Sequence, residues 1–122
     1  MDKNISERIA SLDWNNLQRG LDEQGFAVFP PILDANECFG ILDAYEDEAL
    51  YRKTIDMKRY RFGIGEYKYY EAPLPARLQQ LREGFYPELA KAANRWLNQL
   101  GKEKRYPDSF QDFLEECHEA GQ

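Results

Sequence analysis

The sequence contains one histidine, His118, and two cysteines, Cys38 and Cys117, so it is poor in the side chains that hold transition metals. A facial iron site needs two histidines and a carboxylate, and structural zinc sites need four cysteine or histidine ligands. We therefore predict that this chain by itself holds no metal and contributes no catalytic residue. The cysteines form no Cys-x-x-Cys pair, and we interpret both as buried free thiols.

Long apolar runs are also absent. No stretch approaches the roughly 20 apolar residues that span a bilayer, and residues 1–10 lack the apolar centre of a secretion signal. We therefore predict a cytoplasmic protein without a membrane partner. The chain has 43% hydrophobic and 31% charged residues, a globular composition, and no linker or repeat divides it. Residues 1–122 are interpreted as a single domain or as a fragment of a larger protein.

Hydrophobic periodicity predicts an α+β chain that is mostly helical, with a small antiparallel sheet. Asp13 is expected to cap a helix that ends at Gly25, and Asp34 with Glu37 forms a capping box for another helix. Residues 26–29, Phe-Ala-Val-Phe, are too few for a helix and lie between Gly25 and two prolines. They are therefore expected to form a short strand.

The C-terminal half is expected to consist of amphipathic helices. One helix begins at Pro75 and is expected to end near Gly84 and Pro87, where a longer helix follows and runs to Gly101. Asp108 is expected to cap the last helix. The residues that helical spacing places on inner faces, and that we expect to be buried, are Leu42, Leu89, Trp96 and Leu97.

One segment reverses the acidic character of the chain, whose net charge is −6. Residues 51–70 contain six Lys or Arg residues against Asp56 and Glu66, so this segment carries +4 and the remainder −10. Its tyrosines and β-branched residues predict one or two strands joined around Gly63 or Gly65. The segment is either a hairpin with its tyrosines packed on helices, or a surface that binds anions, an acidic peptide or single-stranded nucleic acid.

The run from Gly25 to Cys38, GFAVFPPILDANEC, resembles the opening of prolyl-hydroxylase-type 2-oxoglutarate/iron(II) dioxygenases. In that family a glycine and an aromatic residue start a short strand, and an acidic or small cap begins a long supporting helix. The resemblance to a bacterial branch of the family continues over residues 21–96. Its later motifs are Tyr67-Lys68-Tyr69-Tyr70, Pro73-Leu74-Pro75, Leu81-Arg82, Tyr86-Pro87-Glu88-Leu89 and Asn94-Arg95-Trp96.

The resemblance implies a parent oxidoreductase, a hydroxylase whose double-stranded β-helix holds iron(II) through a His-x-Asp pair and a distal histidine. A basic residue of that β-helix binds 2-oxoglutarate. None of these ligands can be carried over, because the one histidine here is followed by Glu119 and Ala120. Iron(II) and 2-oxoglutarate are therefore expected as cofactors of the full-length parent and not of this chain.

The resemblance also implies that the chain is the N-terminal supporting region of such an enzyme, inactive alone, with the missing C-terminal β-helix region as its partner. Self-association through an uncovered apolar face is a further expectation. The segment between the helices can border the substrate entrance. The candidate residues for this substrate lip are Arg59, Arg61, Tyr67, Tyr69 and Tyr70.

Two rival functions stay open. The chain is then a small cytoplasmic interaction module that binds an acidic partner, or a module that binds nucleic acid, in both cases through residues 51–70. The net negative charge argues against nucleic acid as a partner of the chain as a whole. The reading frame beyond Gln122 separates these possibilities, because a His-x-Asp pair and a later histidine would support the enzyme.

Overall fold

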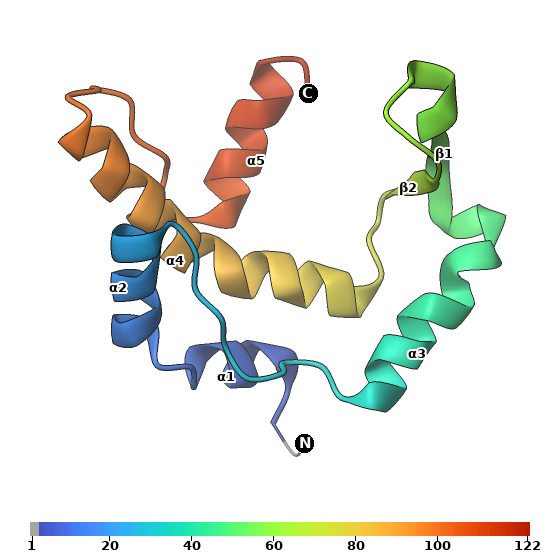
Figure 1. Ribbon diagram of the computed structural model, residues 1–122, viewed down its shortest axis with the longest axis horizontal. Coiled ribbons are helices and arrows are strands. Elements are labelled where there is room, and N and C mark those ends of the chain that lie inside the picture. Colours follow the sequence, from blue (N-terminus) through green and yellow to red (C-terminus); the bar gives the residue numbers. More distant parts are fainter. Residues whose placement is uncertain (1–2) are drawn as a thin grey trace. The chain divides into compact units, whose positions relative to one another are not determined.

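The computed structural model describes residues 3–122 (Figure 1). It confirms an α+β chain that is mostly helical with a small antiparallel sheet. The chain divides into two compact units. The helical unit consists of the segment that ends at Ile32 together with Arg77–Gln122, and the hairpin unit consists of Leu33–Ala76. The expectation of a single domain stays a prediction.

The first two helices begin and end at the residues that local chemistry favours. α1 (Ile5–Ala10) starts where the side chain of Asn4 accepts a hydrogen bond from the amide of Glu7. α2 (Trp14–Gln24) starts at Asp13, whose carboxylate accepts from an amide of the first turn at 3.2 Å. It ends at Gly25, which has a left-handed φ of 81°. The predicted cap and stop of α2 are both confirmed.

The predicted strand at residues 26–29 is wrong. These residues are extended, but in the described part of the chain no strand lies beside them, and a strand needs a neighbour for its backbone hydrogen bonds. The segment instead passes close to α2, where the carbonyl oxygen of Phe26 would lie 3.2 Å from a Cβ at Gly20. Phe29 packs on the ring of Phe85 at 5.4 Å, whereas Val28 remains 83% exposed.

The predicted break between two C-terminal helices is also wrong. α4 (Ala76–Gln99) is one helix that runs through both Gly84 and Pro87. Gly84 has a packing role, because a Cβ there would lie 2.6 Å from the Cδ1 atom of Ile9. Helix propensity is a weak preference that such packing overrides. The predicted end near Gly101 is confirmed, since this glycine follows the helix with a φ of 71°.

α5 (Phe110–Glu119) begins one residue later than expected. Ser109, and not Asp108, is its N-cap, and the Ser109 hydroxyl accepts from the amide of Asp112 at 3.1 Å. The error is small because both residue types cap helices well.

The core of the helical unit is small and differs from the predicted core. The buried apolar residues are Ile5, Ile9, Leu17, Ile32, Ala90 and Ala92. The expectation for α4 is wrong at two positions, because Leu89 is 51% and Trp96 is 37% exposed, while Leu97 is half-buried. Periodicity shows which side of a helix is apolar, but it cannot show whether another element covers that side.

α3 (Ala35–Asp43) opens the helical part of the hairpin unit. Both hydrogen bonds of the predicted capping box between Asp34 and Glu37 are present, at 2.8 and 2.9 Å. The expected burial of Leu42 is wrong, because this side chain is 65% exposed. Cys38 is a free thiol and is likewise exposed rather than buried. Within residues 3–122 no helix is both long enough and apolar enough to cross a membrane.

The sheet of the hairpin unit is the predicted antiparallel pair. β1 (Tyr51–Asp56) pairs with β2 (Glu66–Tyr70), with a bulge near the start of β1. The connection contains the short helix η3 (Met57–Tyr60), and Gly63 and Gly65 follow it with φ angles of 109° and 140°. Short helices η1 (Ala44–Glu46) and η2 (Glu48–Leu50) link α3 to β1.

Candidate functional site

Strand alternation gives the β1–β2 hairpin two faces of different chemistry. Side chains directly opposite each other in an antiparallel pair lie on the same face. Ile55 therefore shares a face with Tyr67, and Lys53 shares it with Tyr69. We call this the outer face. The pair of Thr54 with Lys68 lies on the opposite, inner face, as does the pair of Asp56 with Glu66.

At one end of the inner face, a lysine is held among tyrosines. The side chain of Lys68 is 4% exposed, and its Nζ atom donates to the carbonyl oxygen of Tyr45 at 2.7 Å. The same ammonium lies 4.0 Å from the ring centre of Tyr45 and 5.1 Å from that of Tyr51. Tyr51 also packs on Tyr70 at 4.9 Å. Partial burial, followed by a hydrogen bond with Tyr51, raises the pKa of Tyr70. These contacts hold the hairpin against η1 and η2.

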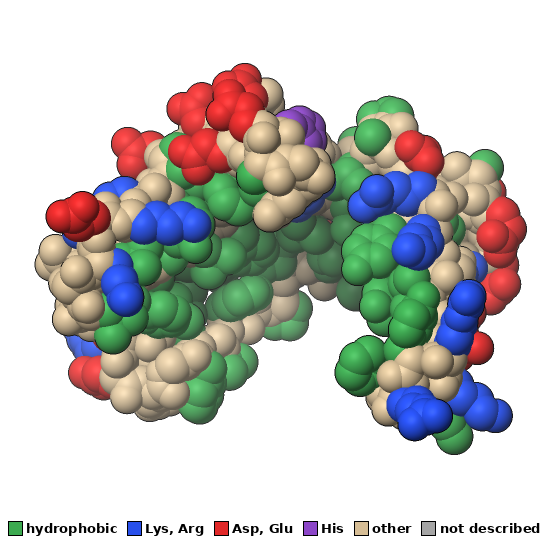
Figure 2. All heavy atoms as spheres, turned by 90° about the horizontal axis from the view of Figure 1, so that it is seen from above, with side chains coloured by type: hydrophobic (Ala, Val, Ile, Leu, Met, Phe, Trp, Pro, Cys, Tyr) green, Lys and Arg blue, Asp and Glu red, His purple; other side chains and the backbone are tan. Residues whose placement is uncertain are grey.

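The outer face, in contrast, forms an open apolar recess of about 490 Å³. Its lining consists of Ile55, Met57, Tyr60, Phe62 and Tyr67. Tyr69 adjoins this lining, because its ring meets Tyr67 edge to face at 5.7 Å. Figure 2 shows the hydrophobic side chains of the hairpin unit gathered on its surface with Lys and Arg side chains beside them. A concave apolar surface bordered by charge is a general feature of binding sites.

Two arginines lie next to the rings of the outer face. The guanidinium of Arg52 is 5.4 Å from the ring centre of Tyr69, and that of Arg59 is 5.9 Å from the ring centre of Tyr60. The carboxylates of the hairpin strands point to the inner face, where Glu66 accepts a hydrogen bond from the Tyr45 hydroxyl at 3.3 Å. The outer face is therefore both aromatic and basic.

The five candidate lip residues do not form one group. Tyr67 and Tyr69 lie on the outer face, and Arg59 borders it from η3. Arg61 follows η3 with a left-handed φ of 62°. Tyr70 is separated from the others, because it lies on the inner face and packs there on a tyrosine.

Of the residues that line the recess, sequence reasoning selected Tyr67 and missed the other four. Among the residues missed, Ile55 and Met57 are half-buried and Phe62 is 76% exposed. Strand alternation could have identified Ile55, because this residue lies opposite Tyr67 and therefore on the same face of the hairpin. Nothing in the pattern marks Phe62, since its position depends on the path of the loop between η3 and β2.

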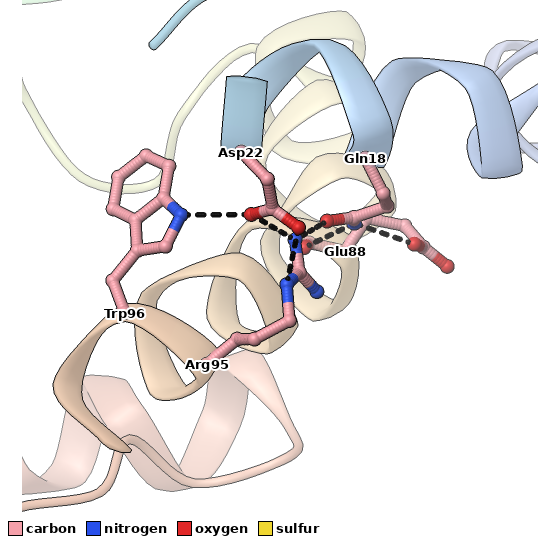
Figure 3. A network of polar contacts seen from close by, with 5 residues as sticks. All are labelled: Gln18, Asp22, Glu88, Arg95 and Trp96. Carbon is pink, nitrogen blue, oxygen red and sulfur yellow. Dashed lines mark hydrogen bonds and ion pairs between the residues drawn. The ribbon is translucent and has the colours of Figure 1, made fainter. Parts of the chain in front are cut away.

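The helical unit contains a polar cluster around Arg95 (Figure 3). Arg95 on α4 donates to both carboxylate oxygens of Asp22 on α2, at 2.8 Å each, and to Gln18 at 2.7 Å. The indole of Trp96 donates to the same carboxylate at 2.9 Å. The hydrogen bonds from Arg95 and then Trp96 lower the pKa of Asp22. Gln18 in turn donates to Glu88. The hydrogen bonds of this cluster therefore join α2 to α4.

A second set of contacts joins α4 to the segment before α5. Asn94 donates to the carbonyl oxygen of Tyr106 at 2.9 Å and accepts from its amide at 2.7 Å. The Tyr86 hydroxyl donates to the carbonyl oxygen of Pro107 at 2.7 Å. Burial, followed by nearby acidic residues, raises the pKa of Tyr86. Its ring packs on Phe113 at 5.1 Å. α4, α5 and their connection are therefore one packed element.

The described residues offer no geometry for a metal. Among residues 3–122 no group of three histidine, cysteine, aspartate or glutamate side chains lies close enough together to hold an ion. His118 is in the last turn of α5, where the helix dipole favours a cation.

Residues 65–122 match a family model described as an oxygenase catalysing oxidative methylation of damaged DNA. Two uncharacterized proteins of Mycobacterium tuberculosis, MT2286 of strain CDC 1551 / Oshkosh and Rv2227 of strain ATCC 25618 / H37Rv, are each 40% identical to this chain over 53 residues. The matched stretch is 43% of this chain and 23% of either relative, so the chain matches less than a quarter of their length. No solved structure matches the chain.

The family match identifies residues 65–122 as an oxygenase-related region. This region contains β2, α4 and α5, and so includes the packed helices as well as one strand of the hairpin. The resemblance to an oxygenase in the sequence is supported at this level. The match does not identify the oxygenase as one of the prolyl-hydroxylase type.

Proposed function

We propose that this chain is the N-terminal, non-catalytic part of an iron(II)- and 2-oxoglutarate-dependent oxygenase that acts on nucleic acid. The observation that carries the proposal is the match of residues 65–122 to an oxygenase family described as acting on damaged DNA. The matched stretch covers 23% of either curated relative, so most of each relative lies outside the match. In the proposed parent, the catalytic region lies outside this chain.

The ligand chemistry supports this division of roles. Iron(II) oxygenases of this type hold the metal with two histidines and one carboxylate. The residues of this chain do not fit such a site, since the sequence contains one histidine and the described residues bring no ligand group together. In the proposed parent, the downstream β-helix supplies the iron ligands and the cation that binds 2-oxoglutarate.

The exposed apolar side chains of the helical unit support a bracing role for it. Leu89 and Trp96 are exposed on α4, and Leu100 is exposed just after it. Phe26 and Val28 are exposed in the segment that follows α2. Exposed apolar surface of this kind often marks a protein interface. We propose that the β-helix region of the parent covers these side chains, while the contacts of Arg95 and Asn94 keep the helices in place.

The local positive charge of residues 51–70 favours nucleic acid as the substrate class. The net charge of −6 argues against nucleic acid for the whole chain, but residues 51–70 carry +4. The hairpin also keeps its strand carboxylates on the inner face. Phosphate groups are attracted by such a local excess of cations.

The test is a calorimetric titration of iron(II) into two proteins, the 122-residue chain and a version extended through the region that follows it in its gene. The long version should bind one equivalent of iron in the presence of 2-oxoglutarate, and the short chain should show no stoichiometric binding. Tight binding by the short chain would contradict its non-catalytic role. A long version that folds and binds no iron would contradict the oxygenase assignment.

A further inference from the structure

We infer that the outer face of the β1–β2 hairpin is a stacking site for an unpaired base of single-stranded nucleic acid. This inference rests on the proposed function, and it assigns the substrate contact to particular residues of the hairpin unit. The proposed ligand is a strand whose base enters the apolar recess while its phosphates meet the bordering arginines.

The recess has the size and lining that a planar base requires. Its volume of about 490 Å³ falls within the ~300–1,000 Å³ that is typical of small-molecule sites. Its aromatic members Tyr60, Phe62 and Tyr67 are all exposed, so ring surface is available to a ligand. Bases stack on exposed aromatic rings of this kind without a requirement for a particular sequence.

The outer face and its border carry three cations that can meet the phosphates of a stacked nucleotide. Arg52 and Arg59 each lie over a tyrosine ring at the border of the outer face, and Lys53 lies on this face opposite Tyr69. Asp56 and Glu66 are on the other face, so the side chains of this face that come from the strands include cations but no carboxylate. Aromatic rings alternating with cations are the usual composition of single-strand binding grooves.

The inner face gives this site a fixed support. Lys68 is buried there against Tyr45 and Tyr51, and Glu71 donates its amide to the carbonyl oxygen of Leu50 at 2.8 Å, beyond the end of β2. Tyr67 and Tyr69 therefore project from a strand pair whose opposite side packs around Lys68, whereas Tyr60 and Phe62 lie on η3 and in the loop after it. A site held by packed elements loses less entropy on binding than a free loop does.

The recess should bind single strands more tightly than duplexes, because its aromatic rings contact the flat face of a base. In a duplex both faces of each base are covered by its stacked neighbours, and exposing one face requires unpairing. The recess is apolar, so it offers little hydrogen-bonding capacity for reading base edges in a groove. An acidic peptide would use the cations but not the aromatic lining.

The experiment measures binding of the 122-residue chain to a labelled oligothymidylate of about 12 nucleotides by fluorescence anisotropy. The duplex of the same length is the second ligand, and a fluorescent oligoglutamate is the third. The single strand should bind more tightly than the other two. Phe62→Ala should weaken its binding roughly tenfold, and Phe62→Trp should restore it.

The matched control is Phe39→Ala, which removes an exposed ring from α3 in the same unit but outside the recess. This variant should bind as the unchanged protein does. Arg52→Ala with Arg59→Ala should reduce the salt dependence of binding, by about 0.7 in the logarithmic slope for each cation lost. Amide exchange of β1 and β2 confirms that each variant keeps its hairpin.

Three results would overturn the inference: no binding of the single strand, equal weakening by Phe39→Ala and Phe62→Ala, or tighter binding of oligoglutamate than of the strand. The last would identify an acidic protein partner instead. The proposed function can be tested separately from this inference. Turnover of DNA by the long version that Phe62→Ala leaves unchanged would contradict this inference alone, and strand binding without any oxygenase activity would contradict the proposed function alone.

Discussion

Ile9 packs its Cδ1 atom against Gly84, at a point where a Cβ on the glycine would lie 2.6 Å away. Ile9 is the most fully buried large side chain of the described residues, and it brings α1 onto α4 where α4 has no side chain. Gly84, which the sequence analysis interpreted as a helix break, is therefore the residue of α4 on which the core residue Ile9 packs. The close approach of α1 to α4 at this point therefore requires a glycine.

Gly84→Ala should destabilise the chain, although alanine is the better helix former by about 1 kcal/mol. The added methyl group overlaps Ile9, and overpacking of a core typically costs about 1–3 kcal/mol. Denaturant unfolding followed by circular dichroism measures the change. In an Ile9→Val background, which removes the Cδ1 atom, Gly84→Ala should cost clearly less. Equal costs in both backgrounds would show that the two residues do not meet.

Asp22 should make the stability of the helical unit depend on pH. Arg95 and Trp96 lower its pKa in the folded state, so its contribution is present above the unfolded pKa of about 3.9. The contribution is lost as the pH falls through the folded pKa. The stability difference between the unchanged chain and Asp22→Asn should be constant near neutral pH and should shrink below about pH 4.

The measurement is denaturant unfolding at several pH values between about 3 and 7. Glu23→Gln is the matched control, because Glu23 is the next residue of α2, whereas the hydrogen bonds of Arg95 go to Asp22 and Gln18. Its profile should follow that of the unchanged chain. A constant difference for Asp22→Asn across the whole range would contradict the ion pair.

The sequence predicted local features better than it predicted contacts. The cap at Asp13, the capping box of Asp34 and the turn at Gly63 and Gly65 each depend on a few neighbouring residues, and all were confirmed. Residues 26–29 were misassigned because a strand is defined by its partner. Their apolar run fits an extended segment equally well when Phe29 packs on a helix.

The same limit applies to the core and the candidate site. Leu42 lies on an apolar helix face that periodicity detects, yet it is exposed because nothing in the described residues covers it. Tyr67 and Tyr70 looked equivalent in the sequence, and strand alternation places them on opposite faces. Phe62 could not be selected, since its place at the recess depends on the backbone path after η3.

Lys68→Met should loosen the hairpin. Methionine keeps an apolar stem but removes the ammonium that donates to the carbonyl oxygen of Tyr45 and lies over two tyrosine rings. Loss of a buried hydrogen-bond partner costs about 1–3 kcal/mol. Hydrogen exchange of the β1 and β2 amides should accelerate accordingly. Lys53→Met, on the exposed outer face, should leave the exchange rates unchanged, and similar rates in the two variants would contradict the inner-face packing.

The 122-residue chain alone should self-associate through its exposed apolar side chains. Phe26 and Val28 lie close together in the sequence and are both exposed, so Phe26→Ser with Val28→Ser should shift sedimentation toward the monomer. Leu100→Ser changes one exposed side chain at the end of α4 and should have a smaller effect. A clean monomer at high concentration for the unchanged chain would contradict the uncovered surface.

We propose that this chain supports an oxygenase without carrying out its chemistry. The most direct test is succinate formation from 2-oxoglutarate, with iron(II), oxygen and damaged single-stranded DNA, by the chain alone and by the version extended beyond Gln122. Only the extended version should form succinate, and DNA should stimulate it. Succinate formed by the 122-residue chain alone, or none formed by a folded, iron-loaded extended version, would contradict the claim.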